Sequence, residues 1–247
     1  MLPDSAERQR LLSADIAGAE IHITEQRVDK RVARVYGFGV REVATESGLD
    51  EIIAFLKEQN VDIVRFRVPP TEQAPEVAEW LVQHGMKRST FVVQWIATCD
   101  SIRSVETEFD IRAAQDGDRE ALGRLIAEGY RIRTAEGVEF HSRIGEIPGM
   151  ICCLCFDGAK AIGTGAIYRD HMGCILEYAT TEKTYRNRGV QTAMIGFRLN
   201  AARKMGCEWA CASTMTNDRS SRNLRKQGFV KAYDEQVYVC DSFNASR

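Results

Sequence analysis

The feature that most constrains this chain is the segment 185–194, Tyr-Arg-Asn-Arg-Gly-Val-Gln-Thr-Ala-Met. An extended run, 173–181, precedes it, and apolar residues recur at helical spacing over 190–205. Gly189 is therefore predicted to open a helix, where backbone N–H groups lack partners and the helix dipole is positive. Two arginines stand where acidic residues are normally favoured. The segment thus predicts a site for an anion such as pyrophosphate.

Composition places few other limits on the chain. Its 247 residues suffice for one large domain or two modest ones. The formal net charge of -2 gives no broad reason to expect nucleic acid as a partner. No apolar run approaches the roughly 20 residues that span a bilayer, and the first ten residues lack the apolar core of a signal peptide. We expect a cytoplasmic protein with no membrane partner.

The eight cysteines could indicate a metal site or disulfides. Cys152, Cys153 and Cys155, however, fall in one apolar run that is typical of a buried strand. Neighbours on a strand point to opposite faces, so Cys152 and Cys153 cannot easily share a metal. No second Cys or His pair has zinc spacing. We interpret these cysteines as small core residues and expect no metal.

Two glycine pairs, Gly163-Thr164-Gly165 and Gly37-Phe38-Gly39, look like fragments of nucleotide-binding loops. Neither continues into Gly-Lys-Ser/Thr or into the full dinucleotide pattern. Both lie in runs that look extended, which favours close approaches of neighbouring backbone as their cause.

From residue 109 onward, the sequence predicts a continuous series of strands and helices. Strands are expected at 109–113, 151–156, 161–168, 174–181, 209–215 and 236–240, and helices at 116–130, 190–205 and 220–227. Asp157-Gly158 is a strong hairpin signal. On the helix 190–205, Arg198, Arg203 and Lys204 are predicted to lie on the polar side. Residues 131–149 are expected to form a loop or broken helix, a candidate substrate lid.

The first hundred residues repeat part of this order. Strands are expected at 32–43, 61–68 and 90–97, and helices at 49–59 and 74–84. The stretch 80–86 matches 223–229 in form, and 45–50 falls where 186–191 stands in the second half. The early copy keeps a helix-opening glycine but replaces both arginines with Thr45 and Ser47. It also adds Glu46 and Asp50, carboxylates that would repel a phosphate. We predict an internal repeat whose first copy no longer binds the ligand.

Arg-x-Arg-Gly-Val-Gln at a strand-to-helix turn, followed by 217–229, resembles the GNAT superfamily of acyl-CoA-dependent N-acyltransferases. The resemblance covers roughly 109–247, and the first half is similar to the C-terminal part of the same fold. It implies an α/β (α+β mixed-sheet) GNAT-like fold: a degenerate N-terminal domain, residues 1–105, without a cofactor site, and a complete catalytic domain, residues 106–247.

The resemblance also implies where acetyl-CoA, the expected cosubstrate, would bind. Backbone N–H groups around Arg188 to Thr192 would hold the pyrophosphate, and strand residues would bond to the pantetheine arm. Asparagines after the next strand would line the thiol end. The residues expected to bind acetyl-CoA are Ala179, Thr180, Thr181, Arg186, Arg188, Gly189, Val190, Gln191, Thr192, Asn217, Ser221 and Asn223. Gln191 departs from the small residue that the family has there and fits if its side chain points off the helix.

Acyl transfer to an amine also needs an acid and a base. Glu177 is the candidate base, because a partly buried carboxylate on this strand could have a raised pKa; the alternative is a surface or salt-bridge glutamate. The resemblance implies a tyrosine four residues before Gly228 as general acid, but that residue is Leu224. Tyr233 and Tyr238 are the candidate substitutes, and packing roles are the alternative for both.

We therefore predict a GNAT-type N-acetyltransferase that moves an acetyl group from acetyl-CoA to an amine in a ternary complex. The expected acceptor is a small molecule or a peptide, and a homodimer is compatible with the sequence. The alternative is a non-catalytic acyl-CoA-binding or assembly protein, which Leu224 and the altered first copy favour.

Overall fold

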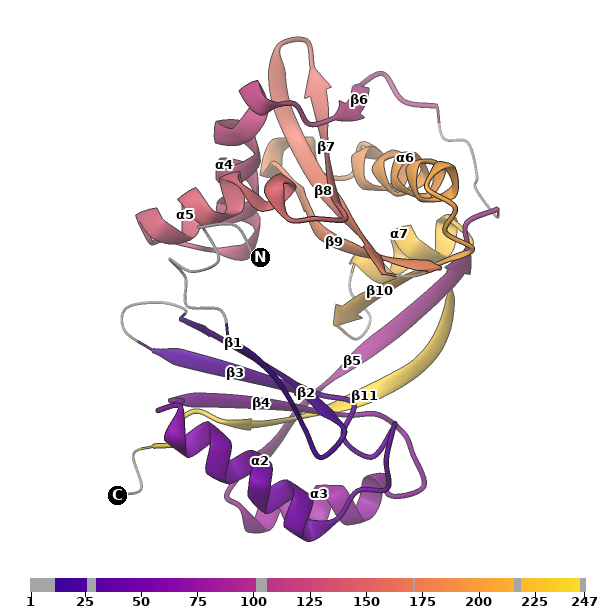
Figure 1. Cartoon of the computed structure of the whole chain (residues 1–247). Coiled ribbons are helices and arrows are strands. Elements are labelled where there is room, and N and C mark those ends of the chain that lie inside the picture. Colours follow the sequence, from indigo (N-terminus) through magenta and orange to yellow (C-terminus); the bar gives the residue numbers. More distant parts are fainter. Residues whose placement is uncertain (1–11, 26–29, 101–105, 171, 216–218, 245–247) are drawn as a thin grey trace. The chain divides into compact units, whose positions relative to one another are not determined.

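The computed structural model describes residues 12–25, 30–100, 106–170, 172–215 and 219–244 (Figure 1). The chain forms two compact units. The N-terminal unit comprises residues 6–93 and 233–247, and the C-terminal unit is built from residues 94–232. Strand β5 (Lys87–Thr98) begins in the N-terminal unit and ends in the C-terminal unit, whereas β11 (Val230–Cys240) does the reverse. Each unit therefore contains a strand end from the other half of the sequence.

The N-terminal unit is a sheet with its helices on one face (Figure 1). Its strand order is β1-β2-β3-β4-β11, in which β3 and β4 are parallel and the other neighbours are antiparallel. The elements are β1 (Leu12–Ile16), β2 (Ala19–Glu25), β3 (Arg31–Tyr36), α2 (Glu46–Glu58), β4 (Ile63–Val68) and α3 (Ala74–Gln83). The strand–helix–strand–helix order over 31–83 confirms the order expected from the sequence.

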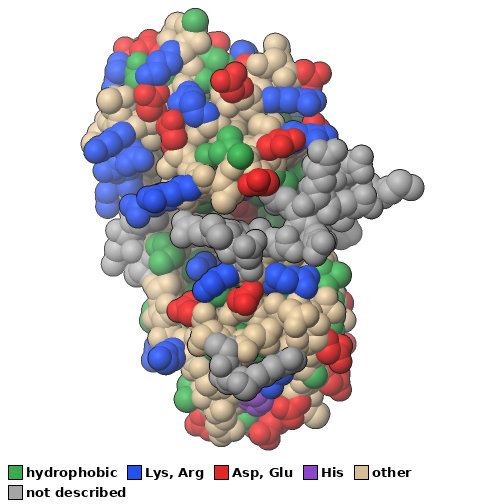
Figure 2. Space-filling view, turned by 90° about the vertical axis from the view of Figure 1, so that its left-hand side faces the viewer, with side chains coloured by type: hydrophobic (Ala, Val, Ile, Leu, Met, Phe, Trp, Pro, Cys, Tyr) green, Lys and Arg blue, Asp and Glu red, His purple; other side chains and the backbone are tan. Residues whose placement is uncertain are grey.

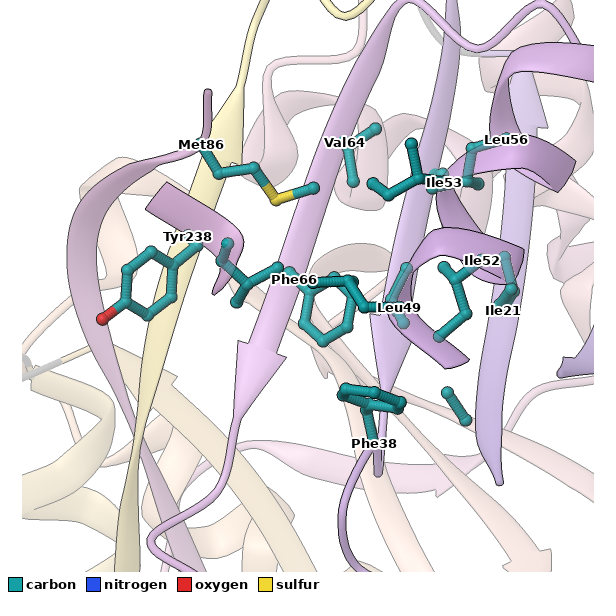
Figure 3. Close-up of a cluster of buried hydrophobic side chains, with 14 of the residues drawn as sticks. Ile21, Phe38, Leu49, Ile52, Ile53, Leu56, Val64, Phe66, Met86 and Tyr238 are labelled. Atoms are coloured by element: carbon teal, nitrogen blue, oxygen red, sulfur yellow. The ribbon is translucent and has the colours of Figure 1, made fainter. Parts of the chain in front are cut away.

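An apolar cluster fills the space between this sheet and its helices (Figure 3). Helix α2 buries Leu49, Ile52, Ile53 and Leu56 on one stripe, the spacing of an amphipathic helix. Tyr238, from β11, lies in the same cluster with 6% of its surface exposed. The end of β11 is therefore part of the N-terminal core.

The C-terminal unit is a mixed sheet with the strand order β5-β10-β9-β8-β7-β6. Its elements are β6 (Asp110–Ala113), the 3₁₀ turn Asp116–Asp118, α4 (Arg119–Tyr130), α5 (Ala135–Ser142), the 3₁₀ turn Ile144–Glu146, β7 (Met150–Asp157), β8 (Lys160–Asp170), β9 (Gly173–Thr181), the 3₁₀ turn Lys183–Tyr185, α6 (Val190–Lys204), β10 (Trp209–Met215) and α7 (Arg219–Lys226). The hairpin predicted at Asp157-Gly158 joins β7 to β8. The segment 131–149 is a broken helix, as expected.

Strand β7 shows that helices cover both faces of this sheet. Cys152 packs in a cluster with residues of α4, while Cys153 and Cys155 pack on the opposite face with Val190 and Met194 of α6. All three cysteines are free and buried. Burial raises the pKa of Cys152 to about 12 and that of Cys153 to about 11, so both remain neutral thiols. Their predicted role as core residues is confirmed.

The ends of α3 and α7 have the same backbone geometry. Met86 N–H donates to Leu81 O, and Phe229 N–H donates to Leu224 O, at 3.0 and 3.1 Å. A glycine with positive φ precedes each donor, Gly85 at 78° and Gly228 at 86°. This left-handed cap is one that glycine adopts without strain. The two stretches that match in sequence therefore also match in local structure.

Two expectations for the N-terminal half were wrong. The strand expected at 32–43 ends at Tyr36, because Gly37 and Gly39 adopt φ of 72° and 78° and turn the chain. These glycines thus lie in a turn, not in an extended run. The β1–β2 hairpin was not identified from sequence. Its turn places Ala17 at φ 49°, a conformation for which alanine gives no sequence signal.

Figure 2 shows basic and acidic side chains interspersed over one face of the molecule, with apolar side chains in scattered groups. This mixture agrees with the small net charge. Among the residues that the structure describes, no helix is both long enough and apolar enough to cross a membrane.

Candidate functional site: a strand opening and a helix N-terminus

Strand β9 separates from its parallel neighbour β10 partway along its length. The two strands pair at three positions, from Trp209↔Gly173 to Cys211↔Ile175. Beyond Ile175, β9 continues through residues 176–181 and keeps its antiparallel pairing with β8. In the described residues, therefore, the far half of β9 has a sheet neighbour on the β8 side and an opening on the β10 side. An extended ligand can bind such an edge as an added strand.

A β-bulge lies within this opened half. Thr164 is opposite Thr180 and Ala166 is opposite Glu177, so two residues of β9 face one residue of β8. Tyr178 takes up the extra residue with φ 51°, a conformation that is uncommon for a non-glycine residue. Bulges re-aim the backbone and side chains of a strand, and they often occur beside active sites.

The helix that follows β9 begins without a side-chain cap. Gly189, at φ 81°, is the N-cap of α6, and no acidic residue lies in the first turn. Asn187 also has a positive φ, 70°, whereas Arg188 does not, so the sign of φ alternates along the turn into the helix. Backbone N–H groups in such an alternating turn form the concave anion-binding sites called nests. Residues 186–189 are exposed. The N–H groups of this first turn can therefore meet an anion from solvent.

The loop before α6 is tied to the β7–β8 hairpin. Tyr185 Oη donates to Asp157 at 3.0 Å, and Lys160 Nζ pairs with Glu182 at 2.7 Å. Arg188 pairs with Glu108 at 2.7 Å and lies over the Tyr185 ring. The carboxylate of Glu108 raises the pKa of Arg188. The anion that the sequence predicted beside Arg188 is thus supplied in part by the chain, through an exposed pair that is easily exchanged.

Gln191 connects the end of β9 to the first turn of α6. Its Nε2 donates to Thr180 O at 2.5 Å and to Thr181 Oγ1 at 3.0 Å. The side chain therefore turns back onto the strand end, which explains how glutamine fits at a position where the resemblance implied a small residue. Arg186 Nε donates to Thr181 O at 3.2 Å. Strand end, loop and helix start form one hydrogen-bonded segment.

The structure places most of the predicted acetyl-CoA residues on this segment. Ala179 is exposed, whereas Thr180 is buried and donates to Leu125 O. Thr192 Oγ1 lies 3.4 Å from Asn223 Oδ1, so the middle of α7 contacts the first turn of α6. The residues brought together are Ala179, Thr180, Thr181, Arg186, Arg188, Gly189, Val190, Gln191, Thr192 and Asn223. Their roles in binding stay predictions.

The other predicted site residues are not part of this segment. Ser221 has 1% of its surface exposed, and its hydroxyl is 2.9 Å from that of Thr214, so it belongs to the packing between α7 and β10. Tyr233 and Tyr238 belong to the N-terminal unit, and Tyr238 is in that unit's core. Asn217 lies outside the described residues. The structure thus gives Tyr238 the packing role that was the alternative for it.

Glu177, the predicted base, is exposed. Its side chain is therefore not the partly buried carboxylate that the sequence predicted. It does lie close enough to Tyr130, at the end of α4, to influence that phenol. Half of the surface of Tyr130 is exposed, but its hydroxyl is hydrogen-bonded to the backbone of Ala179 in β9. This local burial, with the charge of Glu177, raises the pKa of Tyr130 to about 12, while Arg198 and a backbone hydrogen bond from Ala179 oppose the rise.

Arg198 was predicted on the polar side of its helix, and this was wrong. Only 2% of its surface is exposed. Nε donates to Met194 O, and Nη1 lies 3.5 Å from Ala166 O and 3.4 Å from Glu177 O. One signal was available in the sequence: Arg198 follows Val190 and Met194 at intervals of four, so it continues their buried stripe. Tyr130 and Tyr178 carried no comparable signal.

The assembled site offers hydrogen bonds and positive charge to an extended anionic ligand, and a carboxylate, Glu177, beside the strand opening. Among the described residues no group of three or more His, Cys, Asp or Glu side chains is arranged to hold a metal ion. The geometry supports polar, acid–base chemistry on a bound ligand.

No protein-family model matches the chain, and no curated protein matches it in sequence. Solved structures do match. A GCN5-related N-acetyltransferase from Kribbella flavida superposes with a TM-score of 0.69 at 13% identity, over 95% of this chain and 91% of that one. A GCN5-related N-acetyltransferase from Sphaerobacter thermophilus gives 0.66 at 13% identity, over 90% and 76%.

A tandem GNAT protein from the clavulanic acid biosynthesis pathway gives a TM-score of 0.61 at 11% identity, over 93% of this chain and 80% of that one. These coverages extend over both units. The chain has the GNAT fold, as the sequence predicted.

Proposed function

We propose that the C-terminal unit transfers an acetyl group from acetyl-CoA to an amine while both substrates are bound. The observation that carries this proposal is the opening of β9 away from β10, which leads directly to the uncapped start of α6. A pantetheine arm can bond to an open strand edge, and a pyrophosphate can bind a helix N-terminus. The likeness to GNAT structures supports the same assignment through the fold.

In this proposal, residues 179–181 contact the pantetheine arm. Arg186, Arg188 and the N–H groups of residues 190–192 hold the pyrophosphate, and Asn223 lines the thiol end together with Asn217. The cofactor thus binds to the predicted domain 106–247. The acceptor is a small-molecule or peptide amine, and the reaction takes place in the cytoplasm, where thiols stay reduced.

A neutral amine attacks the acyl carbon of acetyl-CoA: the C–N bond forms, the C–S bond breaks, and the proton that the attacking nitrogen then loses goes to the departing thiolate, which leaves as CoA thiol. Glu177, or a water that it orders, takes the proton that an ammonium acceptor must lose first. The exposed position of Glu177 on the opened half of β9 allows it to reach the amine. Backbone N–H groups of β9 polarise the thioester carbonyl, and holding both substrates together supplies the remaining rate enhancement.

Two measurements test the proposal. Calorimetry should show that acetyl-CoA binds, and incubation with a panel of primary amines should release free CoA thiol with at least one of them. Desulfo-CoA is the matched control, because it keeps the pyrophosphate and pantetheine but cannot give a free thiol. Absence of acetyl-CoA binding would show that the assignment is wrong.

A second candidate function is a non-catalytic acyl-CoA-binding protein. The resemblance implies a tyrosine as general acid at the position of Leu224, and this leucine is buried, with 4% of its surface exposed. Tyr238, a candidate substitute for that tyrosine, is in the N-terminal core. Tight binding of acetyl-CoA with no CoA release from any amine would favour this function over catalysis.

A further inference from the structure

Arg198 is a buried cation for which the proposed reaction has no assigned role. It lies on α6, beneath the sheet, and 2% of its surface is exposed. Burial lowers its pKa, but a guanidinium remains charged because its ordinary pKa is so high. Burying such a charge costs free energy unless hydrogen bonds compensate it. Its position therefore calls for an explanation beyond packing.

The bonds of Arg198 converge on the bulge of β9. Nη1 lies 3.4 Å from the carbonyl oxygen of Glu177, the residue before the bulge, and 3.5 Å from that of Ala166, the partner of Glu177 on β8. Space for the guanidinium comes from Gly165, where a Cβ would lie 2.9 Å from Arg198 Cζ. A side chain on one helix and a missing side chain on one strand thus combine to place a cation under the bulge.

Its bonds fix the direction of one peptide group. The Glu177 carbonyl is held toward β8 and α6, and the following N–H points the opposite way because the peptide is trans. The N–H of Tyr178 therefore points to the β10 side of β9, where the two strands have stopped pairing. Donation to a carbonyl also polarises the peptide and strengthens the donor at its other end.

The N-terminal unit provides a comparison. Its helix α2 follows a strand that has a parallel neighbour, as α6 does, but Thr45 caps it and the glycine predicted to open it, Gly48, lies within its first turn; α2 buries Leu49, Ile52, Ile53 and Leu56 against its sheet. The half of the chain without the predicted cofactor loop fills this helix face with apolar side chains alone. The buried cation therefore accompanies the opened strand, not the fold in general.

We propose that Arg198 is a positioning residue for acyl transfer, holding the β9 bulge so that its backbone donors meet the thioester carbonyl and adding a fixed positive charge behind them. This inference rests on the proposed function. A low-dielectric site makes such preorganised charge and donors effective, because they need no reorganisation during the reaction.

The test is isotope-edited infrared spectroscopy of acetyl-CoA labelled with ¹³C at the acetyl carbonyl. In the wild-type protein the bound carbonyl band should lie at lower frequency than the free one. Arg198→Met should lose most of this shift, and Arg198→Lys, which keeps the charge, should retain part of it. In Arg198→Met, the affinity for acetyl-CoA should change by less than about threefold. The rate of CoA release in the presence of an amine should fall by roughly 100-fold, the scale of one lost oxyanion donor.

Ile195→Ala is the matched control, because Ile195 is also buried on α6 but is not bonded to the bulge. It should lower stability and leave the carbonyl band unchanged. If Arg198→Met does not fold, Arg198→Lys and Gly165→Ala carry the test, the latter by displacing the guanidinium. If folded Arg198 variants leave the carbonyl band of bound acetyl-CoA unchanged, the inference about Arg198 is wrong and the proposed function still stands. A wild-type protein without acetyl-CoA binding would overturn the proposed function and this inference together.

Discussion

Each half of this chain contains a strand that has a parallel neighbour and leads into a helix, and the two junctions differ. In the N-terminal unit, β3 and β4 pair from Val32↔Ile63 to Val35↔Phe66, one residue short of the end of β3. In the C-terminal unit, β9 and β10 separate after Ile175 while β9 continues to Thr181. The first pair of strands is therefore joined along almost its whole length, and the second leaves residues 176–181 of β9 without pairing to β10.

The N-termini of α2 and α6 also differ: the chain itself caps the first and leaves the second uncapped. Thr45 caps α2 by accepting from Gly48 N–H at 3.1 Å, and Glu46 lies in the first turn. A Cβ on Gly48 would lie 2.9 Å from Ala17 Cβ, so the β1–β2 hairpin packs on this helix start. The start of α6 has neither a side-chain cap nor an acidic residue. The N–H groups of a helix N-terminus bond to a side-chain cap, to water or to an anion; α2 has the cap, and for α6 we propose the anion.

The largest expected effect follows from the charges at the second helix start. Arg186→Ala combined with Arg188→Ala should weaken acetyl-CoA binding by about 100-fold, since each charge-assisted hydrogen bond contributes roughly 1.5 kcal/mol. Calorimetry measures the change. The matched variant, Thr45→Ala with Ser47→Ala, should leave the affinity unaltered. Equal effects of the two double variants would remove the functional distinction between the halves.

A smaller effect is expected on stability, in the opposite half. Thr45→Ala removes the cap of α2 and should lower the free energy of unfolding by about 1 kcal/mol. Arg186→Ala should cost far less, because that side chain is exposed and caps no N–H group. Denaturant titrations measure the free energy of unfolding of both variants. An equal loss in the two would contradict the difference in capping between α2 and α6.

Glu108 forms an ion pair with Arg188 and should therefore compete with acetyl-CoA for this arginine, a competition that has no counterpart predicted at the start of α2. Glu108→Gln should remove the ion pair that now occupies Arg188, and acetyl-CoA should then bind about threefold more tightly, the scale of an exposed pair. Glu106→Gln, in the same stretch, is the control. Weaker binding in Glu108→Gln would mean that this carboxylate helps to orient Arg188.

The smallest expected effect concerns pH. Hydrogen bonds from Arg112, at 2.6 and 3.0 Å, lower the pKa of Asp118 below its ordinary 3.8. The folded-state pKa is thus below the unfolded one, so the stabilisation is complete above pH 4 and disappears as the pH falls through the folded value. Asp118→Asn should cost about 0.5 kcal/mol at pH 7, and the difference from wild type should close as the pH falls below the folded-state pKa of Asp118.

Acid should therefore weaken the C-terminal unit, in which Arg143 likewise lowers the pKa of Glu146. Unfolding curves that follow Trp95, in the C-terminal unit, and Trp80, in the N-terminal unit, can separate the two transitions. A wild-type-to-variant difference that stays constant down to pH 2 would contradict the assigned ion pair.

Local sequence signals predicted the local structure. Gly189 opens α6, Asp157-Gly158 turns a hairpin, and Cys152 and Cys153 face opposite sides of the sheet, because each follows from the geometry of a few consecutive residues. The glutamine at position 191 could be judged only as a departure from the family pattern. Its bond to Thr180 depends on the strand end that the fold brings to it.

The sequence by itself determined most of the order of strands and helices from β3 onward, the matching ends of α3 and α7 and the place of the exposed arginines. Only the tertiary structure decided that β9 leaves β10 after Ile175, that Arg198 lies beneath the bulge and that Tyr238 joins the N-terminal core. The physical reason is the range of the interactions. Periodicity and capping act within one or two helical turns, whereas strand separation and burial depend on partners distant in the chain.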